Sequence, residues 1–463
     1  MVVKREHLAK AKDIFSDTEL NLTVEGAKHL GAAIGTMEYS WEYTEEQVDV
    51  WCDMVENLAE IASSHPHLAY SNFTSSLKFK WVYMQRTIPD TAESFQRLED
   101  TIRNTLIPKL IGRPCNDTER RVFALPIREG GLGIDNPAET APIFYSNSEH
   151  VTEPLVANIL DVEEKKKPTH EVETEIAKRR LDCSVKEMMR QKELREAVCK
   201  NESKWTRTLS LNMETGASSW LSARPLEVFN RELSKSEFID AMCLRYGFEI
   251  NGQFSECVCG KQNGADHALS CSTGGFTIMR HNEIRDTLAD IITHAGYKGV
   301  EIEKVLQPVN PNDYPKSANT APDARSDVYA IGLWRKQQGA HVDVAVFHPT
   351  APSYRDKEPR ALYRLHESRK KRDYQQRIRE AERGAFTPFV MSTSGGAGPE
   401  AEKLIKKLAS RITVKHDDKY PETINFIRTR IRFCLLRSTL VSLRGTRKNF
   451  TLPPPISTCD FVD

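Results

Sequence analysis

Four candidate metal ligands lie close together in this 463-residue chain, with the spacing Cys-x-Cys-x7-His-x3-Cys. They are Cys257, Cys259, His267 and Cys271. Zinc takes four sulfur or nitrogen ligands at the corners of a tetrahedron, so a loop this short must turn tightly around it. Gly260 and Gly264 provide such turns. The spacing therefore predicts a small structural zinc site with no open position; a reduced loop with fortuitous cysteines is the alternative.

Two aspartates on strand-like segments follow the cysteines. Asp327 directly precedes the segment 328–331, and Asp343 lies inside the alternating run 342–346. In a strand, Asp343 faces away from the flanking valines, and burying a carboxylate there is costly unless a metal or another partner neutralises it. Phosphodiester cleavage by Mg²⁺ or Mn²⁺ requires carboxylates that hold the metal. The pattern indicates a catalytic metal site; an aspartate on the wet face of a half-exposed strand is the alternative.

A basic run downstream could complete this carboxylate site. Lys370 or Lys371, together with Tyr374, could reach the metal from one helix, where a lysine would stabilise charge on a phosphate. A solvated basic helix face is the alternative explanation of this run. Three more carboxylates compete for or could extend the site: Asp323 is an alternative to Asp327, and Glu301 or Glu303 could join. His281 is expected to begin the next helix or to contact phosphate rather than to bind metal.

The formal charge balances at 65 basic and 65 acidic residues, but the two kinds are unevenly distributed. Basic residues gather in 364–383 and 403–448, whereas acidic residues concentrate upstream. The end of the second stretch has the apolar spacing of an amphipathic helix, whose cations could follow phosphates and make binding salt-dependent. These cations are Arg428, Arg430, Arg432, Arg437, Arg444, Arg447 and Lys448. DNA or RNA is the expected partner, and an acidic protein surface is the alternative.

Cysteine usage and hydropathy bear on the compartment. No run of roughly twenty apolar residues occurs, and the N-terminus has no apolar leader, so neither a membrane protein nor a secreted one is expected. The cysteines outside the cluster are scattered, unlike those of a disulfide scaffold. They are Cys52, Cys115, Cys183, Cys199, Cys243, Cys434 and Cys459. A reducing intracellular compartment with ordinary thiols is the expectation.

Composition and periodicity divide the chain into four regions of an α+β multidomain protein. They are residues 1–148, mainly helical; 149–217, a charged helical linker; 218–290, a helical lead-in with the Cys/His cluster; and 291–463, an α/β region with basic C-terminal helices. Strands are expected at 300–305, 328–331 and 342–347, and helices resume after residue 360, interrupted by a glycine-rich loop at 392–399.

The first region carries local helix signals. Thr44 and Gln47 have the spacing of a capping box, and apolar residues follow at alternating intervals of three and four. This stripe, expected to be buried, is Val48, Trp51, Val55, Leu58 and Ala62. Further helices are expected within 73–83 and 95–107, the latter closed by Pro108, before a glycine-rich turn at 125–134.

In their order along the chain, these motifs resemble one family, the C-terminal part of a non-LTR retrotransposon polyprotein with a restriction-like endonuclease of the PD-(D/E)XK type. Residues 26–31 resemble the end of a reverse-transcriptase palm with its primer-grip hairpin, and the helices and glycine-rich turn up to 133 resemble its thumb. The Cys/His cluster resembles the family's CCHC zinc knuckle. The nuclease motifs are matched by Asp327 and Asp343, and by Lys370 and Tyr374 as Lys-x-x-x-Tyr.

The resemblance implies a nuclear protein that binds DNA or RNA, with structural Zn²⁺ and a DNA-nicking site that uses Mg²⁺ or Mn²⁺. Three departures accompany it. No Tyr/Phe-x-Asp-Asp motif precedes residue 26, so reverse transcription is not expected. Ser326 stands where the family has proline, and Ala345 occupies the usual position of the catalytic lysine, which must then come from the later helix. The alternative is an inactive remnant or domesticated fragment that binds RNA or DNA.

Overall fold

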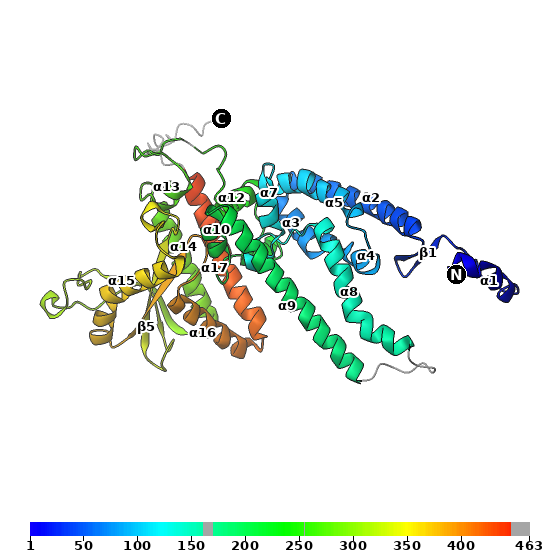
Figure 1. Cartoon of the computed structure of the whole chain (residues 1–463). Helices are drawn as coiled ribbons and strands as arrows, with labels where there is room; N and C mark the ends of the chain where they lie inside the picture. Colours follow the sequence, from blue (N-terminus) through cyan, green and yellow to red (C-terminus); the bar gives the residue numbers. More distant parts are fainter. Residues whose placement is uncertain (161–169, 254, 446–463) are drawn as a thin grey trace, which may run out of the picture. The chain divides into compact units, whose positions relative to one another are not determined.

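The computed structural model describes residues 1–160, 170–253 and 255–445 of a mixed α+β protein (Figure 1). The contacts within the chain divide it into two units. The first comprises residues 1–209 and 224–239, and the second comprises 210–223 and the chain from 240 onward. The four regions predicted from the sequence are finer than this division and stay a prediction.

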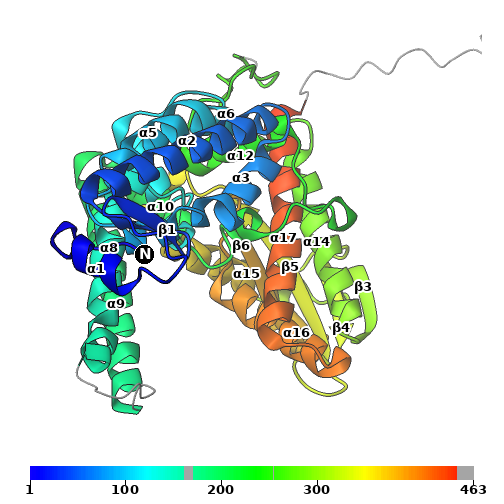
Figure 2. The ribbon, with the colours of Figure 1, turned by 90° about the vertical axis from the view of Figure 1, so that its right-hand side faces the viewer.

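The first unit is almost entirely helical. A short hairpin of β1 (Gly26–His29) and β2 (Ala32–Gly35) is its only sheet within the described residues. Its helices are α1 (Leu8–Ile14), α2 (Met37–Ala62), α3 (Pro66–Ser75), α4 (Val82–Thr87), α5 (Ser94–Thr101), α6 (Ile107–Ile111), α7 (Asp117–Ala124), α8 (Pro137–Leu160) and α9 (His170–Asn201). Helices α8 and α9 run beside each other in opposite directions (Figure 1, Figure 2). The charged run 163–168 lies outside the described residues.

The long helix α2 confirms one sequence prediction and corrects another. All five residues of the predicted apolar stripe are buried. The predicted capping box is wrong, because Thr44 lies inside α2 and its hydroxyl donates to the carbonyl of Ser40 at 2.7 Å. The helix begins earlier, at Met37, where the side chain of Thr36 accepts from the amide of Tyr39. The Thr-x-x-Gln spacing is short enough to occur by chance within a helix.

The helix ending predicted at Pro108 is also wrong. Residues Ile102–Leu106 form a π-helical stretch after α5, and Pro108 lies beyond it in α6, within a helical run that continues without a break. Helical structure ends instead at Gly112, which has a φ of 78° in the left-handed region that favours glycine.

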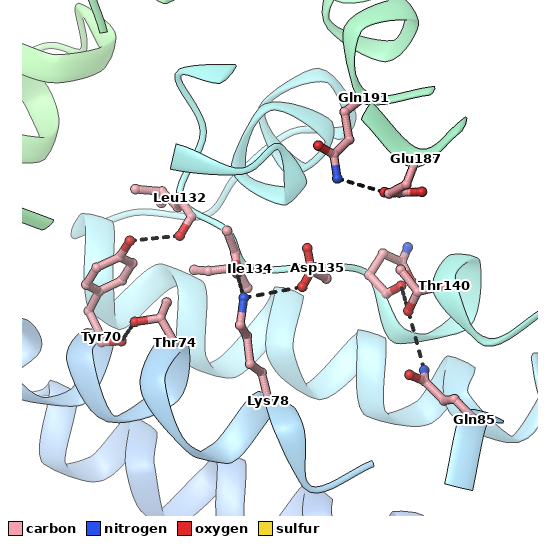
Figure 3. A network of polar contacts seen from close by, with 12 residues as sticks. Tyr70, Thr74, Lys78, Gln85, Leu132, Ile134, Asp135, Thr140, Glu187 and Gln191 are labelled. Atoms are coloured by element: carbon pink, nitrogen blue, oxygen red, sulfur yellow. Dashed lines mark hydrogen bonds and ion pairs between the residues drawn. The ribbon is translucent and has the colours of Figure 1, made fainter. Parts of the chain in front are cut away.

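Side chains near α3 hold the glycine-rich turn that leads into α8 (Figure 3). The hydroxyl of Tyr70 donates to the carbonyl of Leu132 at 2.8 Å. Lys78 donates to the carbonyl of Gly133 at 3.0 Å and lies 3.4 Å from a carboxylate oxygen of Asp135. Gly133 has a φ of 66°, so a side chain there would strain the backbone. The segment is thus a fixed part of this unit.

The second unit contains a four-stranded sheet in the order β3-β4-β5-β6. The strands are β3 (Lys298–Val305), β4 (Arg325–Ile331), β5 (Gly339–Phe347) and β6 (Ala385–Ser392). The first three strands are antiparallel and confirm the strands predicted from the sequence, whereas β6 pairs in parallel with β5 and was missed. Pro388 obscured it, because proline cannot donate in a sheet and is tolerated only at edges such as this one.

Helices cover both faces of this sheet. The helices that pack on it are α14 (Phe276–His294), α15 (Pro359–Glu380), α16 (Pro399–His416) and α17 (Tyr420–Arg444). The second unit also contains α11 (Ser219–Ser222) and α13 (Ala265–Ser270), while α12 (Lys235–Tyr246) begins in the first unit and α10 (Lys204–Asn212) spans the boundary between the units. Phe389 and Met391 pack in the large core with α14, α16 and α17, while Val390 packs with α15. Because neighbouring strand residues face opposite sides, α15 lies on one face and α14, α16 and α17 on the other (Figure 2).

Candidate metal centre and active site

Two short segments of the second unit bring the Cys/His cluster together. Cys257 and Cys259 lie in a turn closed by a hydrogen bond from the Gly260 amide to the Cys257 carbonyl at 2.8 Å. Gly260 has a φ of 77°, as such a turn requires. His267 lies on α13, and Cys271 directly follows that helix. The four candidate ligand atoms all lie within 4.8 Å of one another.

The donor set of this cluster fits zinc. Cys259 Sγ and His267 Nε2 are 3.3 Å apart, and two ligands on a tetrahedral zinc are separated by about 3.5 Å, given its usual bond lengths. Cys257 and Cys271 are buried, whereas Cys259 is exposed. Among the described residues, this is the only group of three or more His, Cys, Asp and Glu side chains that could hold a metal ion. The cluster could therefore bind a metal such as zinc.

Asp266, the neighbour of His267, ties the cluster to the end of β5. One of its carboxylate oxygens lies 2.9 Å from His348 Nε2 and accepts from the hydroxyl of Thr350 at 2.8 Å. The other oxygen accepts from Arg355 at 3.2 Å. Although burial opposes ionisation, these hydrogen bonds lower the pKa of Asp266 to about 2. Asp266 therefore stays charged and positions α13 beside the C-terminal end of β5.

The carboxylate of Asp343 lies in the middle of β5 and is paired inside the protein. The residue is 3% exposed, so it does not lie on a wet strand face. Lys370 on α15 places its ammonium nitrogen 2.6 Å from Asp343 Oδ2. Burial raises the pKa of Asp343 to about 6, with Lys370 opposing this and Asp327 adding to it. Burial would lower the pKa of Lys370, but the two carboxylates hold it above its usual value.

Asp327 approaches the same place from β4. Its Oδ2 accepts from the backbone amide of Val344 at 2.6 Å, and its Oδ1 lies 3.1 Å from His281 Nε2. His281 lies on α14, and its contact with Asp327 makes it part of this site. The sequence did not predict this role. The site thus combines two carboxylates, a lysine and an imidazole from four separate elements.

Tyr374 lies one helical turn beyond Lys370, and its ring centroid is 5.8 Å from the lysine nitrogen. Its hydroxyl accepts from the side-chain amide of Asn319 at 3.0 Å. A cavity of about 540 Å³ opens here. Its lining is Ser317, Ala318, Asn319, His366, Arg369, Lys370, Asp373 and Tyr374. This polar hollow therefore reaches Lys370, the residue that pairs with Asp343.

The other candidates from the sequence lie elsewhere. Lys371 pairs with Glu400 of α16, so the structure places Lys370 rather than Lys371 at the two aspartates. The three alternative carboxylates are not part of the site. Glu301 pairs with Lys304, and Glu303 pairs with Arg285 and Arg325. Asp323 is exposed and precedes β4. Of the predicted carboxylates in the described part of the chain, Asp327 and Asp343 are therefore the two that lie together at this site.

Four of the α17 arginines that were expected to follow phosphates have partners inside the second unit. Arg428 pairs with Glu402 at 2.7 Å, and the buried Arg432 donates to the carbonyl of Ala217. Two further ion pairs join Arg430 to Asp290 at 3.0 Å and Arg444 to Asp240 at 2.6 Å. These four cations hold the second unit together, and a phosphate-tracking role for this helix stays a prediction. Arg447 and Lys448 lie outside the described residues, as does Cys459.

No protein-family model matches the sequence, and no curated protein matches it. In the described ranges, no helix is both long and apolar enough to cross a membrane.

Proposed function

We propose that this chain is a divalent-metal-dependent nucleic-acid hydrolase, more particularly a DNA-nicking endonuclease. The observation that carries the proposal is the buried Asp343, held 2.6 Å from the ammonium nitrogen of Lys370 and joined at the same site by Asp327. Paired carboxylates beside a lysine are the groups that metal-assisted phosphodiester cleavage requires. A cavity opens beside Lys370, where a phosphate could enter.

The broader identity that we propose is the C-terminal part of a non-LTR retrotransposon polyprotein. Its support is the order of the motifs: a helical region with a short hairpin, then a CCHC cluster, then a mixed sheet with two aspartates. The first region corresponds to the reverse-transcriptase thumb, and the sheet of the second unit to the restriction-like endonuclease. A nuclear location and DNA or RNA as partner follow from this proposal.

The residues of the site divide the chemistry between them. Asp327 and Asp343 would hold Mg²⁺ or Mn²⁺, which supplies a Lewis acid and an activated water when bound. Lys370 provides positive charge in the lining of the cavity, where it can stabilise negative charge on a phosphate. His281 hydrogen-bonds Asp327 and so fixes the orientation of that carboxylate.

A second candidate is a nucleic-acid-binding protein without cleavage activity. The direct ion pair between Lys370 and Asp343 favours it, because that contact already neutralises the buried carboxylate without a metal. In this case the sheet serves as a scaffold, and the surrounding cations bind phosphates. The two candidates differ in one respect, metal-dependent cleavage.

Nicking of supercoiled plasmid with Mg²⁺ or Mn²⁺ tests the proposal. Wild type is compared with Asp343→Asn, and with Asp182→Asn on α9 as a matched exposed control. We expect nicking by wild type and the control, and its loss in Asp343→Asn with DNA binding retained. DNA binding with no nicking by wild type would refute the enzyme and support the second candidate. Nicking that survives Asp343→Asn would place the active site elsewhere.

A further inference from the structure

One face of α16 carries a row of cations. Lys403, Lys407, Arg411 and Lys415 follow one another at intervals of four residues, which places them along the same side of the helix. No acidic residue occurs between Lys403 and His416. With a rise of 1.5 Å per residue, the row spans about 18 Å, the axial length of about five phosphates on one strand of a duplex.

Aromatic rings and a helix end fix the direction of these side chains. The ammonium nitrogens of Lys403 and Lys407 lie 5.2 and 5.6 Å from the centroid of Trp334. The Trp334 ring is itself held, because its indole N–H donates to the hydroxyl of Thr387 at 2.8 Å. Cation–π contacts of this kind order flexible side chains. The lysines therefore lose less conformational freedom when they meet a ligand.

The far half of the row is ordered in the same way. The Arg411 guanidinium lies 5.3 Å from the centroid of Tyr297, and Lys415 donates to the carbonyl of His294 at 2.8 Å. The row is thus supported along its whole length by the β4–β5 turn and the α14–β3 turn.

The cations of the α16 row lack carboxylate partners of the kind that neutralise the arginines of α17. In the part of the chain that the structure describes, no carboxylate pairs with Lys403, Lys407 or Arg411, whereas Arg428, Arg430 and Arg444 each pair with one. Arg335 and Lys336 add two exposed charges beside Trp334 in the β4–β5 turn. An unneutralised, ordered row of charge attracts a regular polyanion.

We infer that this α16 row is a binding surface for the phosphate backbone of duplex DNA, separate from the candidate active site. The separation follows from the sheet, since Lys370 of α15 lies on one face and α16 packs on the other. The protein would then hold one length of duplex on α16 while a second segment lies at the cavity. The inference rests on the proposed function for its class of partner, nucleic acid, but not on cleavage.

The test measures binding of a fluorescent 30-base-pair duplex by anisotropy, without added Mg²⁺ or Mn²⁺, at a series of salt concentrations. Wild type is compared with Lys403→Gln/Lys407→Gln/Arg411→Gln. Each lost phosphate contact reduces the slope of log K against log salt by about 0.9, so we expect the triple variant to lose about 2.7. A triple substitution on α9, Lys186→Gln/Lys192→Gln/Lys200→Gln, removes the same charge from exposed positions and should leave the slope unchanged.

An unchanged slope in the folded α16 variant, or an equal loss in the α9 control, would overturn the inference. If the triple variant does not fold, the single variant Lys407→Gln should still reduce the slope by about 0.9. Vesicles containing phosphatidylserine serve as a second probe: loss of vesicle binding with DNA binding intact would assign the row to a membrane surface and refute the inference.

Nicking assays on the same proteins separate this inference from the proposed function. A reduced slope together with absent nicking by wild type supports the α16 surface and refutes the enzyme. Nicking that requires Asp343, with an unchanged slope, supports the enzyme and refutes the α16 surface.

Discussion

The Cys/His cluster and the Asp327–Asp343 site differ in the source of their countercharge. The cluster consists of four ligand atoms within 4.8 Å of one another, with Cys259 exposed, so thiolates there would repel one another without a metal. At the carboxylate site the protein supplies a lysine 2.6 Å from Asp343 and a backbone amide 2.6 Å from Asp327. A metal should therefore determine the structure of the first site, whereas the second site should keep its structure without one.

Zinc removal is expected to have the largest effect. Zinc binding contributes about 10–16 kcal/mol to the folding of small zinc-finger peptides, so chelation or Cys271→Ser should unfold the cluster. We expect about one zinc per chain by elemental analysis, and a lower melting temperature after chelation. Cys199→Ser on α9 is the control. A metal-free protein that melts like the untreated one would show that the cluster holds its shape unaided, and the contrast between the sites would fail.

Lys370→Met should be the next most damaging change. Removing one partner of a buried ion pair costs about 3–5 kcal/mol, because the remaining charge is left without compensation. Urea denaturation at pH 8 measures the loss, and added Mg²⁺ or Mn²⁺ should recover part of it if the aspartates bind metal. The matched control is Lys371→Met, whose pair with Glu400 is more exposed and should contribute less than about 1 kcal/mol.

The double variant Lys370→Met/Asp343→Asn completes this test. Without a buried charge to compensate, it should recover most of the stability that Lys370→Met loses. Equal losses in Lys370→Met and Lys371→Met would show that the internal countercharge does not stabilise the site.

Local patterns predicted much of this contrast. The alternation around Asp343 identified β5 and a carboxylate that needs a partner, because strand periodicity is a property of neighbouring residues. The spacing of the cysteines likewise identified the cluster, whose four ligands lie within fifteen residues. The basic run alone left Lys370 and Lys371 as equal candidates, and only the Lys-x-x-x-Tyr spacing of the family resemblance favoured Lys370.

Features that depend on distant segments could not be predicted. His281 reaches Asp327 across 46 residues of sequence, and no spacing rule links a histidine on a helix to a strand that far away. The arginines of α17 looked available for phosphate, but their partners Glu402, Asp290 and Asp240 become neighbours only in the folded chain. Exposed and neutralised cations give the same helical pattern in a sequence, so only the contacts distinguish α16 from α17.

Acid should weaken the sheet around the carboxylate site through His341. This side chain is 1% exposed, and burial lowers its pKa to about 4 from an ordinary value near 6.5. The folded state therefore binds this proton less readily than the unfolded state, so the contribution to stability is present above pH 6.5 and is lost as the pH falls through 4. Its size is about 3 kcal/mol.

His341→Gln isolates this contribution. The variant should lose less stability between pH 7 and pH 4 than wild type, measured by urea denaturation; acid release of zinc occurs in both proteins and cancels in the comparison. A parallel acid dependence in the two proteins would mean that His341 does not titrate in this range.

Tyr374→Phe should have the smallest effect, and it tests how far the internal support of the carboxylate site extends. The change removes the hydroxyl that accepts from Asn319 at 3.0 Å but leaves the ring beside Lys370. One such hydrogen bond contributes about 1 kcal/mol. A double-mutant cycle with Asn319→Ala, followed by urea denaturation, should therefore give a coupling of that size. A coupling near zero would mean that only Lys370, His281 and the Val344 amide stabilise the two aspartates. Tyr374 would then be available to contact the substrate.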